Sequence, residues 1–210
     1  MALYLLYYPS MELNGDSYIN DDSCEQDPRS DLFSFFALLM RYPEESFFDD
    51  ELLDALKGLL DYCELNIPLA GLNEWQDDRD AHQLLKEVQV AYTHLFINAA
   101  PHVIAPPYAS VYMDGDGDLQ GRTTEKIRDF YRQHGLDVVQ QGEPADHIRF
   151  QLECIAALFA DDQEKAAVTF IRTLLYPWFC RFYERFNKEP RHPFYEASLQ
   201  LIHTIVKEEQ

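Results

Sequence analysis

The amino-acid sequence predicts an all-α fold, a single-domain bundle of about seven or more helices. Apolar residues recur three or four positions apart along most of the chain, which is the period of a buried helix face. No segment alternates apolar and polar residues as a half-buried strand does. Hydrophobic residues make up 47% of the 210 residues, which is enough for the core of one domain and too many for a disordered chain.

The chain is expected to begin with a loose acidic N-terminal segment, residues 1–30, followed by an all-helical domain over residues 31–210. Ser30 is a favourable N-cap for the first helix, which is expected to end before Pro43. A second helix carries leucines three or four residues apart and is expected to stop before Pro68.

The middle of the chain is expected to hold a linker and a long loop between helices. Residues 66–77 are the predicted linker, and residues 78–97 are predicted to form the third helix. A long loop is expected over residues 98–122, because this stretch contains two adjacent prolines and a run of glycine and aspartate. The next helix is expected to start at Thr123 or the threonine after it and to end at Gly135, since glycine readily closes a helix.

Prolines and aspartates mark the last helices. Pro144 is predicted at the first position of a helix whose apolar stripe consists of Ile148, Leu152, Ile155 and Phe159. Asp161 and Asp162 are predicted to cap a long helix that is kinked or broken around Pro177. Pro193 precedes the final helix.

The charge of the chain narrows the classes of possible partner. The chain has 37 Asp and Glu against 17 Lys and Arg, which gives a formal net charge of −20. Such a charge repels nucleic acid and anionic lipid and attracts cationic partners. We therefore expect no nucleic-acid partner and no stable insertion into a membrane.

Cysteine usage and the apolar start of the chain indicate where the protein resides. The cysteines lack C-x-x-C spacing, which favours a reducing compartment and predicts neither a zinc nor a haem site. The segment from Met1 to Tyr8 has no basic region of a signal peptide and is far too short to cross a bilayer. A cytoplasmic protein without a metal or other cofactor is expected.

Two short segments are the most informative feature of the sequence. Residues 106–112 begin with two prolines, which stiffen the backbone and present Tyr108 on a rigid turn. Residues 143–148 have the pattern of a helix start, with Asp146 and His147 adjacent to each other. Histidine changes charge near neutral pH, so the pair combines an anion with a switchable group.

Together these two segments resemble the signature of the TorD/DmsD/NarJ family, cytoplasmic chaperones that assemble molybdenum-containing redox enzymes and hold their twin-arginine leader peptides. Further segments that resemble family motifs are Arg41 to Pro43, Tyr92 to Phe96, Leu175 to Trp178, and Phe194 with Tyr195. The resemblance implies a TorD-like helical fold without enzymatic activity. It implies as partner the precursor of a molybdopterin redox enzyme catalytic subunit with its leader, and a chaperone that aids cofactor insertion and holds export until assembly. The family's properties also imply a monomer or a domain-swapped homodimer.

The resemblance further implies a leader-binding groove beside the proline turn. Asp146 would contact a leader arginine, and His147 would order the groove. The residues implied to contact the leader are Tyr92, Leu95, Phe96, Pro107, Tyr108, Glu143, Pro144, Asp146 and His147. Two positions depart from the family's pattern: Gln151 and Ala109 each stand where the family commonly has glutamate, so each removes a carboxylate.

Other interpretations of these residues are possible. Asp146 could cap its own helix while His147 bonds a neighbouring loop, or the pair could act as base and orienting carboxylate of a hydrolase. Tyr92, Leu95 and Phe96 share one helix face and, without the resemblance, are predicted to be core. A generic helical adaptor for some other protein would have the same fold and charge.

The acidic stretch at residues 114–125 resembles a calcium-binding loop. Its acidic residues at positions 1, 3, 5 and 12 of such a loop are Asp114, Asp116, Asp118 and Glu125. However, Leu119 stands where glycine permits the sharp turn, and the stretch follows a proline turn instead of a helix. An acidic loop without metal is the favoured interpretation.

Overall fold

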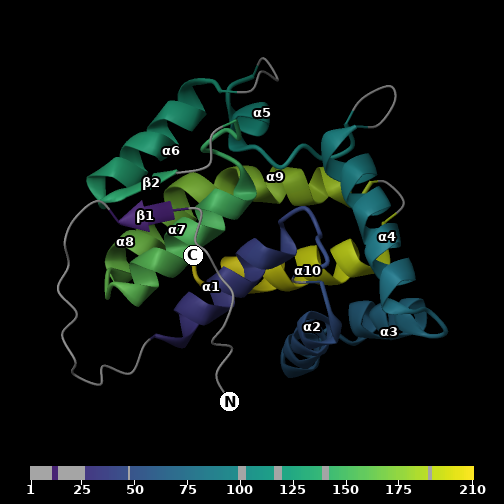
Figure 1. Cartoon of the computed structure of the whole chain (residues 1–210). Helices are drawn as coiled ribbons and strands as arrows, with labels where there is room; N and C mark the ends of the chain where they lie inside the picture. Colours follow the sequence, from purple (N-terminus) through teal and green to yellow (C-terminus); the bar gives the residue numbers. More distant parts are fainter. Residues whose placement is uncertain are drawn as a thin grey trace. The chain divides into compact units, whose positions relative to one another are not determined.

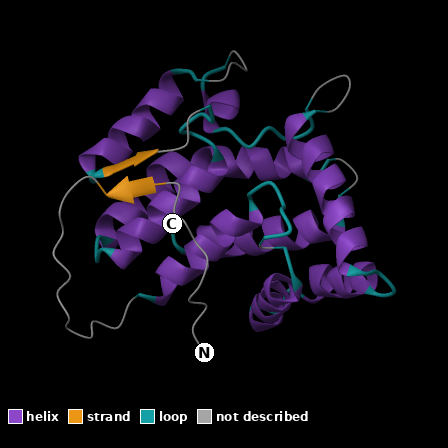
Figure 2. Ribbon diagram, viewed as in Figure 1, coloured by secondary structure: helices purple, strands orange, loops and turns teal. Residues whose placement is uncertain are grey.

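The computed structural model describes residues 11–13, 27–46, 48–98, 103–115, 120–138, 142–188 and 191–210. Helices dominate this part of the chain (Figure 2), which confirms the predicted all-α class. In chain order the elements are β1 (Met11–Leu13), α1 (Pro28–Leu39), α2 (Asp50–Tyr62), α3 (Asn66–Gln76), α4 (Ala81–Tyr92), η1 (Thr93–Ile97), α5 (Ala109–Met113), α6 (Arg122–Gln133), β2 (Leu136–Val138), α7 (Ile148–Ala160), α8 (Glu164–Phe170), η2 (Ile171–Leu175), α9 (Tyr176–Phe186) and α10 (Pro193–Glu208) (Figure 1). The elements η1 and η2 are single π-helical turns.

The elements group into two compact units. Unit 1 holds the described residues of Met1–Met40 and Tyr108–Trp178, together with Gln210, and unit 2 holds those of Arg41–Pro107 and Phe179–Glu209. Unit 1 therefore contains both strands, α1, α5 to α8 and η2. Unit 2 contains α2 to α4, η1, α10 and most of α9. The expectation that residues 31–210 form one domain stays a prediction.

Unit 1 is built around α7, which is buried along nearly its whole length. Helix α1 packs along it, with the ring centroid of Phe33 lying 5.7 Å from that of Phe159. Helices α6 and α8 meet through Phe170, whose ring centroid lies 4.9 Å from that of Phe130 and 5.9 Å from that of Tyr131. This apolar packing fixes α7, whose first residue belongs to one of the two informative segments.

Unit 1 also contains a short antiparallel strand pair that the sequence did not predict. Strand β1 pairs with β2, with Met11 opposite Val138 and Leu13 opposite Leu136. Part of the segment expected to be loose, residues 1–30, is therefore ordered as a strand. Each strand has only three residues, which is too short for an alternating pattern to stand out against a helical background.

Unit 2 has an aromatic core formed by α4, η1, α9 and α10. The ring of Phe96 packs edge to face on Tyr92 and Tyr195, with centroid distances of 5.1 and 5.2 Å. Phe182 of α9 lies 6.2 Å from Phe96, measured between ring centroids. Helix α10 also packs on α2 and α3. Edge-to-face aromatic pairs of this kind stabilise a core beyond their buried area.

Two predicted non-helical segments contain helices. Helix α3 covers nearly all of the predicted linker at residues 66–77, with Pro68 in its first turn. Proline is tolerated there because the first turn of a helix has no intrahelical partners for its N–H groups. The predicted long loop at residues 98–122 contains the short helix α5.

Several predicted helix starts were misplaced, including that of the third helix, which begins at Ala81 instead of residue 78. Helix α1 begins at Pro28 instead of Ser30, and the side chain of Asp27 caps it by accepting from the N–H of Arg29 at 2.9 Å. Helix α7 begins after Pro144, at Ile148. Helix α8 is preceded by Gln163 without a side-chain cap, because Asp162 takes a left-handed φ of 54° and closes the preceding turn instead of opening the next helix.

The irregularity predicted around Pro177 takes the form of the π-helical turn η2. The chain stays helical through this proline, and the N–H of Tyr176 reaches back five residues to the carbonyl of Ile171. A widened turn just before proline relieves the clash between its ring and the preceding turn.

Candidate peptide-binding site

The two informative segments meet in unit 1 through their backbones. Tyr108 and His147 form an isolated antiparallel β-bridge, and the N–H of Ala109 donates to the carbonyl of Asp146 at 3.2 Å. Both bridging residues are extended, with φ and ψ of −125° and 130° at Tyr108 and of −61° and 138° at His147. The structure therefore brings together Tyr108, Glu143, Pro144, Asp146 and His147 of the predicted site.

Asp146 is fully buried and connects α5 to the start of α7. Its Oδ2 accepts from the N–H of Ser110 at 2.8 Å, so the carboxylate caps the neighbouring helix α5 and not its own helix. The exposed fraction of Asp146 is 0%. Its second oxygen, Oδ1, has no hydrogen-bond partner in the part of the chain that the structure describes. The buried carboxylate therefore links the two segments; we call this contact between residues 108–110 and residues 146–151 the joint.

His147 is the N-cap of α7. Its Nδ1 accepts from the N–H of Arg149 at 3.1 Å, and its ring stands edge to face against Tyr108 with a centroid distance of 5.1 Å. Burial, reinforced by the nearby charge of Arg149, lowers the pKa of His147 to about 3. The expectation that His147 changes charge near neutral pH is therefore wrong, because burial keeps the imidazole neutral there.

Gln151 completes the joint with two hydrogen bonds of opposite sense. Its Nε2 donates to the carbonyl of Asp146 at 2.7 Å, and its Oε1 accepts from the indole Nε1 of Trp178 at 3.1 Å. An ionised glutamate could accept from Trp178 but could not donate to a carbonyl. The departure from the family's pattern at this position thus suits the local hydrogen bonding.

The accessible part of the site is a pair of side chains, Tyr108 and Glu143. The phenol of Tyr108 donates to Oε1 of Glu143 at 2.5 Å, and both side chains are half-buried. The adjoining turn is held by Tyr131, whose hydroxyl donates to the carbonyl of Ala145 at 3.1 Å. A hollow of about 290 Å³ beside this pair is lined by Gln120, Arg128, Asp137, Val138, Gly142, Glu143, Pro144 and Ala145.

The other predicted contact residues lie in unit 2 and are buried. Tyr92, Leu95 and Phe96 have exposed fractions of 6%, 2% and 2% and belong to the aromatic core. Pro107 is buried as well. Contact of these four residues with a leader peptide stays a prediction.

Sequence reasoning missed several residues that hold the site together. Ser110 and Tyr131 were not singled out, and Gln151 was noted only as a departure. Buried tyrosine and tryptophan usually need a hydrogen-bond partner for their polar atom. Tyr131 and Trp178 were therefore the two residues from which such bonds could have been expected. Their partners, a carbonyl and an amide, become visible only when the helices are placed.

Asp114, the first position of the calcium-loop pattern, is engaged at the start of α6. Its carboxylate accepts from the N–H and hydroxyl of Thr123, at 3.0 and 2.6 Å for the shortest contacts. A Cβ at Gly121 would lie 2.1 Å from Oδ2 of Asp114, so a larger residue there would displace this carboxylate. Asp116, Asp118 and Leu119 lie outside the described residues. Within the described ranges, no group of three His, Cys, Asp or Glu is placed to hold a metal ion.

Comparison with known proteins identifies the family of the chain. The chain matches the family described as "Nitrate reductase delta subunit" over residues 47–184. It is 33% identical over 150 residues to the chaperone protein TorD of Vibrio vulnificus (strain CMCP6), covering 66% of this chain and 68% of that protein. It is 34% identical over 113 residues to the Tat proofreading chaperone DmsD of Salmonella typhimurium (strain LT2), covering 53% of this chain and 54% of that relative.

A solved structure has the same fold. The crystal structure described as a redox enzyme maturation protein from Archaeoglobus fulgidus matches with a TM-score of 0.57 and 23% identity, covering 90% of this chain and 99% of that one. The fold is thus shared with that structure, and the family match and the chaperone relatives place the chain in the class of redox-enzyme maturation chaperones. The chain belongs to the nitrate reductase delta subunit family, the TorD/DmsD/NarJ family whose signature its sequence resembles.

Among the helices that the structure describes, none combines the length and the apolar character needed to cross a bilayer.

Proposed function

We propose that this protein is a cytoplasmic, non-enzymatic maturation chaperone for a molybdopterin redox enzyme. It binds the twin-arginine leader and the precursor of the catalytic subunit, aids cofactor insertion and holds export until assembly. Family membership supports this function. The observation that carries the proposal is the Tyr108–His147 bridge, which joins the two signature segments and leaves Tyr108 and Glu143 accessible at one place.

Glu143 is the group best placed to meet a leader arginine. One of its carboxylate oxygens accepts from Tyr108, and the other has no hydrogen-bond partner among the described residues. Arginine binds carboxylates through charge-assisted hydrogen bonds, and its guanidinium also stacks on aromatic rings. The paired phenol and carboxylate therefore offer an arginine both kinds of contact.

Asp146 and His147 act in this proposal as positioning residues. Direct contact between Asp146 and arginine would require the carboxylate to leave the N–H of Ser110. The buried pair instead fixes the backbone that presents Tyr108 and Glu143. Tyr92, Leu95, Phe96 and Pro107 would contact the apolar stretch of a leader only after the core of unit 2 loosened.

The test is a thermodynamic cycle on the charge pair. A labelled peptide with two consecutive arginines and an apolar stretch is titrated with wild type and with Glu143→Gln, and again after both arginines are changed to glutamine. We expect a coupling of about 1 kcal/mol, or about fivefold in affinity, since a hydrogen bond to a charged group is being removed. Glu45→Gln, an equal charge change at an exposed residue of unit 2, is the control and should show no coupling.

The cycle also has outcomes that reject the proposal. If wild type does not distinguish the arginine peptide from the glutamine peptide, leader recognition by charge is wrong. If it does distinguish them but Glu143→Gln behaves as wild type, the arginines bind elsewhere. Capture of a molybdoenzyme subunit that depends on its leader separates this chaperone from a generic helical adaptor, and cell fractionation tests the cytoplasmic location.

A further inference from the structure

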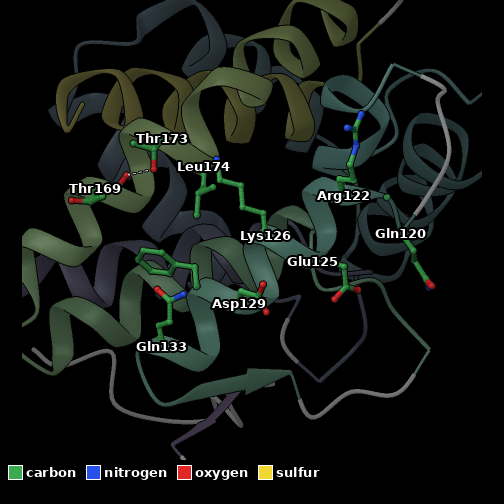
Figure 3. A pocket seen from close by; sticks show the side chains of 11 residues that line it. Gln120, Arg122, Glu125, Lys126, Asp129, Gln133, Thr169, Thr173 and Leu174 are labelled. Atoms are coloured by element: carbon green, nitrogen blue, oxygen red, sulfur yellow. Dashed lines mark hydrogen bonds between the residues drawn. The ribbon is translucent and has the colours of Figure 1, made fainter.

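A second hollow of unit 1 lies between α6 and the wall formed by α8 and η2 (Figure 3). It measures about 810 Å³ and is lined by Gln120, Gly121, Arg122, Glu125, Lys126, Asp129, Phe130, Gln133, Thr169, Thr173 and Leu174. We call it the α6–η2 groove. None of its residues belongs to the predicted leader site, and of its residues the sequence analysis singled out only Glu125, as the last position of the calcium-loop pattern.

The elements that form the α6–η2 groove together have the opposite charge to the chain as a whole, while the lining itself holds two cations, Arg122 and Lys126, and two carboxylates, Glu125 and Asp129. The elements α6, α8 and η2 carry six cationic residues, namely Arg122, Lys126, Arg128, Arg132, Lys165 and Arg172, against Glu125, Asp129 and Glu164. Their formal charge is therefore +3, while the chain carries −20. Six of the 17 Lys and Arg, but only three of the 37 Asp and Glu, thus lie on these elements.

The carboxylates of α6 are neutralised by its own arginines. Glu125 pairs with Arg128, and Asp129 lies 3.8 Å from Arg132. On α8, Glu164 pairs with Arg29 at 2.8 Å between Oε1 and Nη2.

The cations of the groove itself remain without such pairs. Arg122 and Lys126 are exposed and have no carboxylate partner within the described ranges. They stand four residues apart and so share one face of α6. Figure 3 shows the Lys126 side chain reaching across the groove toward Leu174. Among the residues that the structure describes, the groove therefore presents two cations without a carboxylate partner.

The groove combines these cations with apolar surface and an unusual backbone. Phe130 and Leu174 supply apolar surface, and the hydroxyls of Thr169 and Thr173 donate to carbonyls of their own helix, at 2.7 and 2.8 Å. The threonines therefore present methyl groups and acceptor lone pairs. Thr173 and Leu174 belong to the π-helical turn η2, and such turns are rare and frequent at functional sites.

We propose that the α6–η2 groove docks an acidic peptide segment that also carries apolar side chains, supplied by the client precursor. Carboxylates of that segment pair with Arg122 and Lys126, and its apolar side chains pack on Phe130 and Leu174. Charge complementarity favours this occupant, because α6, α8 and η2 carry a formal charge of +3 in a chain whose net charge is −20. The identity of the partner rests on the proposed chaperone function, whereas the peptide chemistry rests on the groove alone.

The test uses a fluorescein-labelled synthetic peptide composed of glutamate, aspartate and leucine, titrated with the full chain and followed by fluorescence anisotropy. We expect the double variant Arg122→Glu and Lys126→Glu to bind about tenfold more weakly. The double variant Lys57→Glu and Lys86→Glu, which makes the same charge change on α2 and α4 of unit 2, should bind as wild type does. Replacing the peptide's leucines by serine should also weaken binding, because the apolar contact is lost.

Each result decides between occupants. If the leucine and serine peptides bind equally, or if inorganic phosphate displaces both at equal concentration, the groove is a simple anion site and the proposal is wrong. The proposal also fails if the two double variants weaken binding equally, or if sedimentation shows a dimer that only the groove variant dissociates. Titration of the same variants with the arginine peptide keeps the two proposals separate: its failure alone rejects leader binding, and failure of the acidic peptide alone rejects the groove.

Discussion

The substitution Gln151→Glu tests the hydrogen-bonded joint between the two signature segments. Gln151 is fully buried, donates to the carbonyl of Asp146 and accepts from the indole of Trp178. An ionised glutamate keeps the bond from Trp178, but it places a negative oxygen against a carbonyl oxygen where the structure has a 2.7 Å hydrogen bond. The substitution brings in the residue common in the family, yet we expect it to destabilise this chain.

The expected cost follows from the lost donor and the buried charge. Loss of a buried hydrogen bond costs about 1–3 kcal/mol, and an uncompensated buried charge costs more. We expect Gln151→Glu to lower the free energy of unfolding by about 3 kcal/mol at pH 8. At about 1.4 kcal/mol per pKa unit, that cost corresponds to a folded-state pKa near 6.5 for the introduced carboxyl, against about 4.3 in the unfolded chain.

The sign of the pH dependence follows from this raised pKa. Below about pH 4.3 the carboxyl is protonated in both states and can donate to the carbonyl of Asp146, so nearly the whole cost should disappear. The cost should grow as pH rises from there and level off above about pH 6.5. Urea unfolding of wild type and variant at matched pH values measures this cost as the difference between their free energies of unfolding.

Gln151→Met is the matched control, because it has a similar shape, removes both hydrogen bonds and introduces no titrating group. Its cost should be about 2 kcal/mol and independent of pH. A cost of Gln151→Glu that does not change between pH 4.5 and pH 8, within the range set by these pKa values, would refute the reasoning. So would a stabilised variant.

Three further predictions concern binding and stability. Tyr108→Ala should weaken binding of the arginine peptide and lower the melting temperature less than Leu152→Ala does. Leu152 lies in the core of α7, so its truncation should cost about 2–5 kcal/mol of stability. Equal losses in melting temperature would show Tyr108 to be core. Affinity for the arginine peptide should fall as salt rises from about 50 to 500 mM, since exposed charges are screened, and an unchanged affinity would mean that apolar contacts dominate. Because His147 has a pKa of about 3 in the folded chain and about 6.5 in the unfolded chain, the unfolded chain takes up its proton first as pH falls, and stability is lost between these two pH values. His147→Gln should therefore reduce the acid loss of unfolding free energy by about 1.4 kcal/mol per pH unit in that window. Parallel pH profiles of wild type and variant would contradict the buried neutral imidazole.

Much of the fold could be predicted because long helices leave a periodic apolar pattern. Helices α6 and α10 carry that pattern beside clear signals, such as Gly135 after α6 with its φ of 74° and Pro193 at the start of α10. Helix α2 carries the pattern too, but it ends at Tyr62, short of the end predicted before Pro68. Helix α3 was missed because Pro68 was taken as a breaker, although proline is harmless in a first turn. The β1–β2 pair was missed because a three-residue strand has no period to detect.

The two segments of the candidate site could be predicted from the sequence, but the hydrogen bonds and the burial of their individual residues could not. The sequence places Asp146 and His147 at a helix start, and the structure confirms that His147 caps α7. It could not show that Asp146 caps α5, because that bond joins residues 36 positions apart in the chain. Nor could it show the burial of His147, which depends on the packing of Tyr108 and Phe150 against its ring.

Burial also changes the meaning of the two missing carboxylates. Gln151 and Ala109 are both fully buried, so glutamate at either position would add charge inside unit 1 and not at its surface. The absence of these carboxylates therefore avoids desolvated charge next to Asp146 without removing any group that a leader arginine could reach. The accessible negative charge of the site comes from Glu143, held in place by Tyr108, and from Asp137 in the lining of the adjoining hollow. The strength with which this chain grips a cationic peptide should then depend on Glu143, and on Asp146 only through the backbone that it fixes.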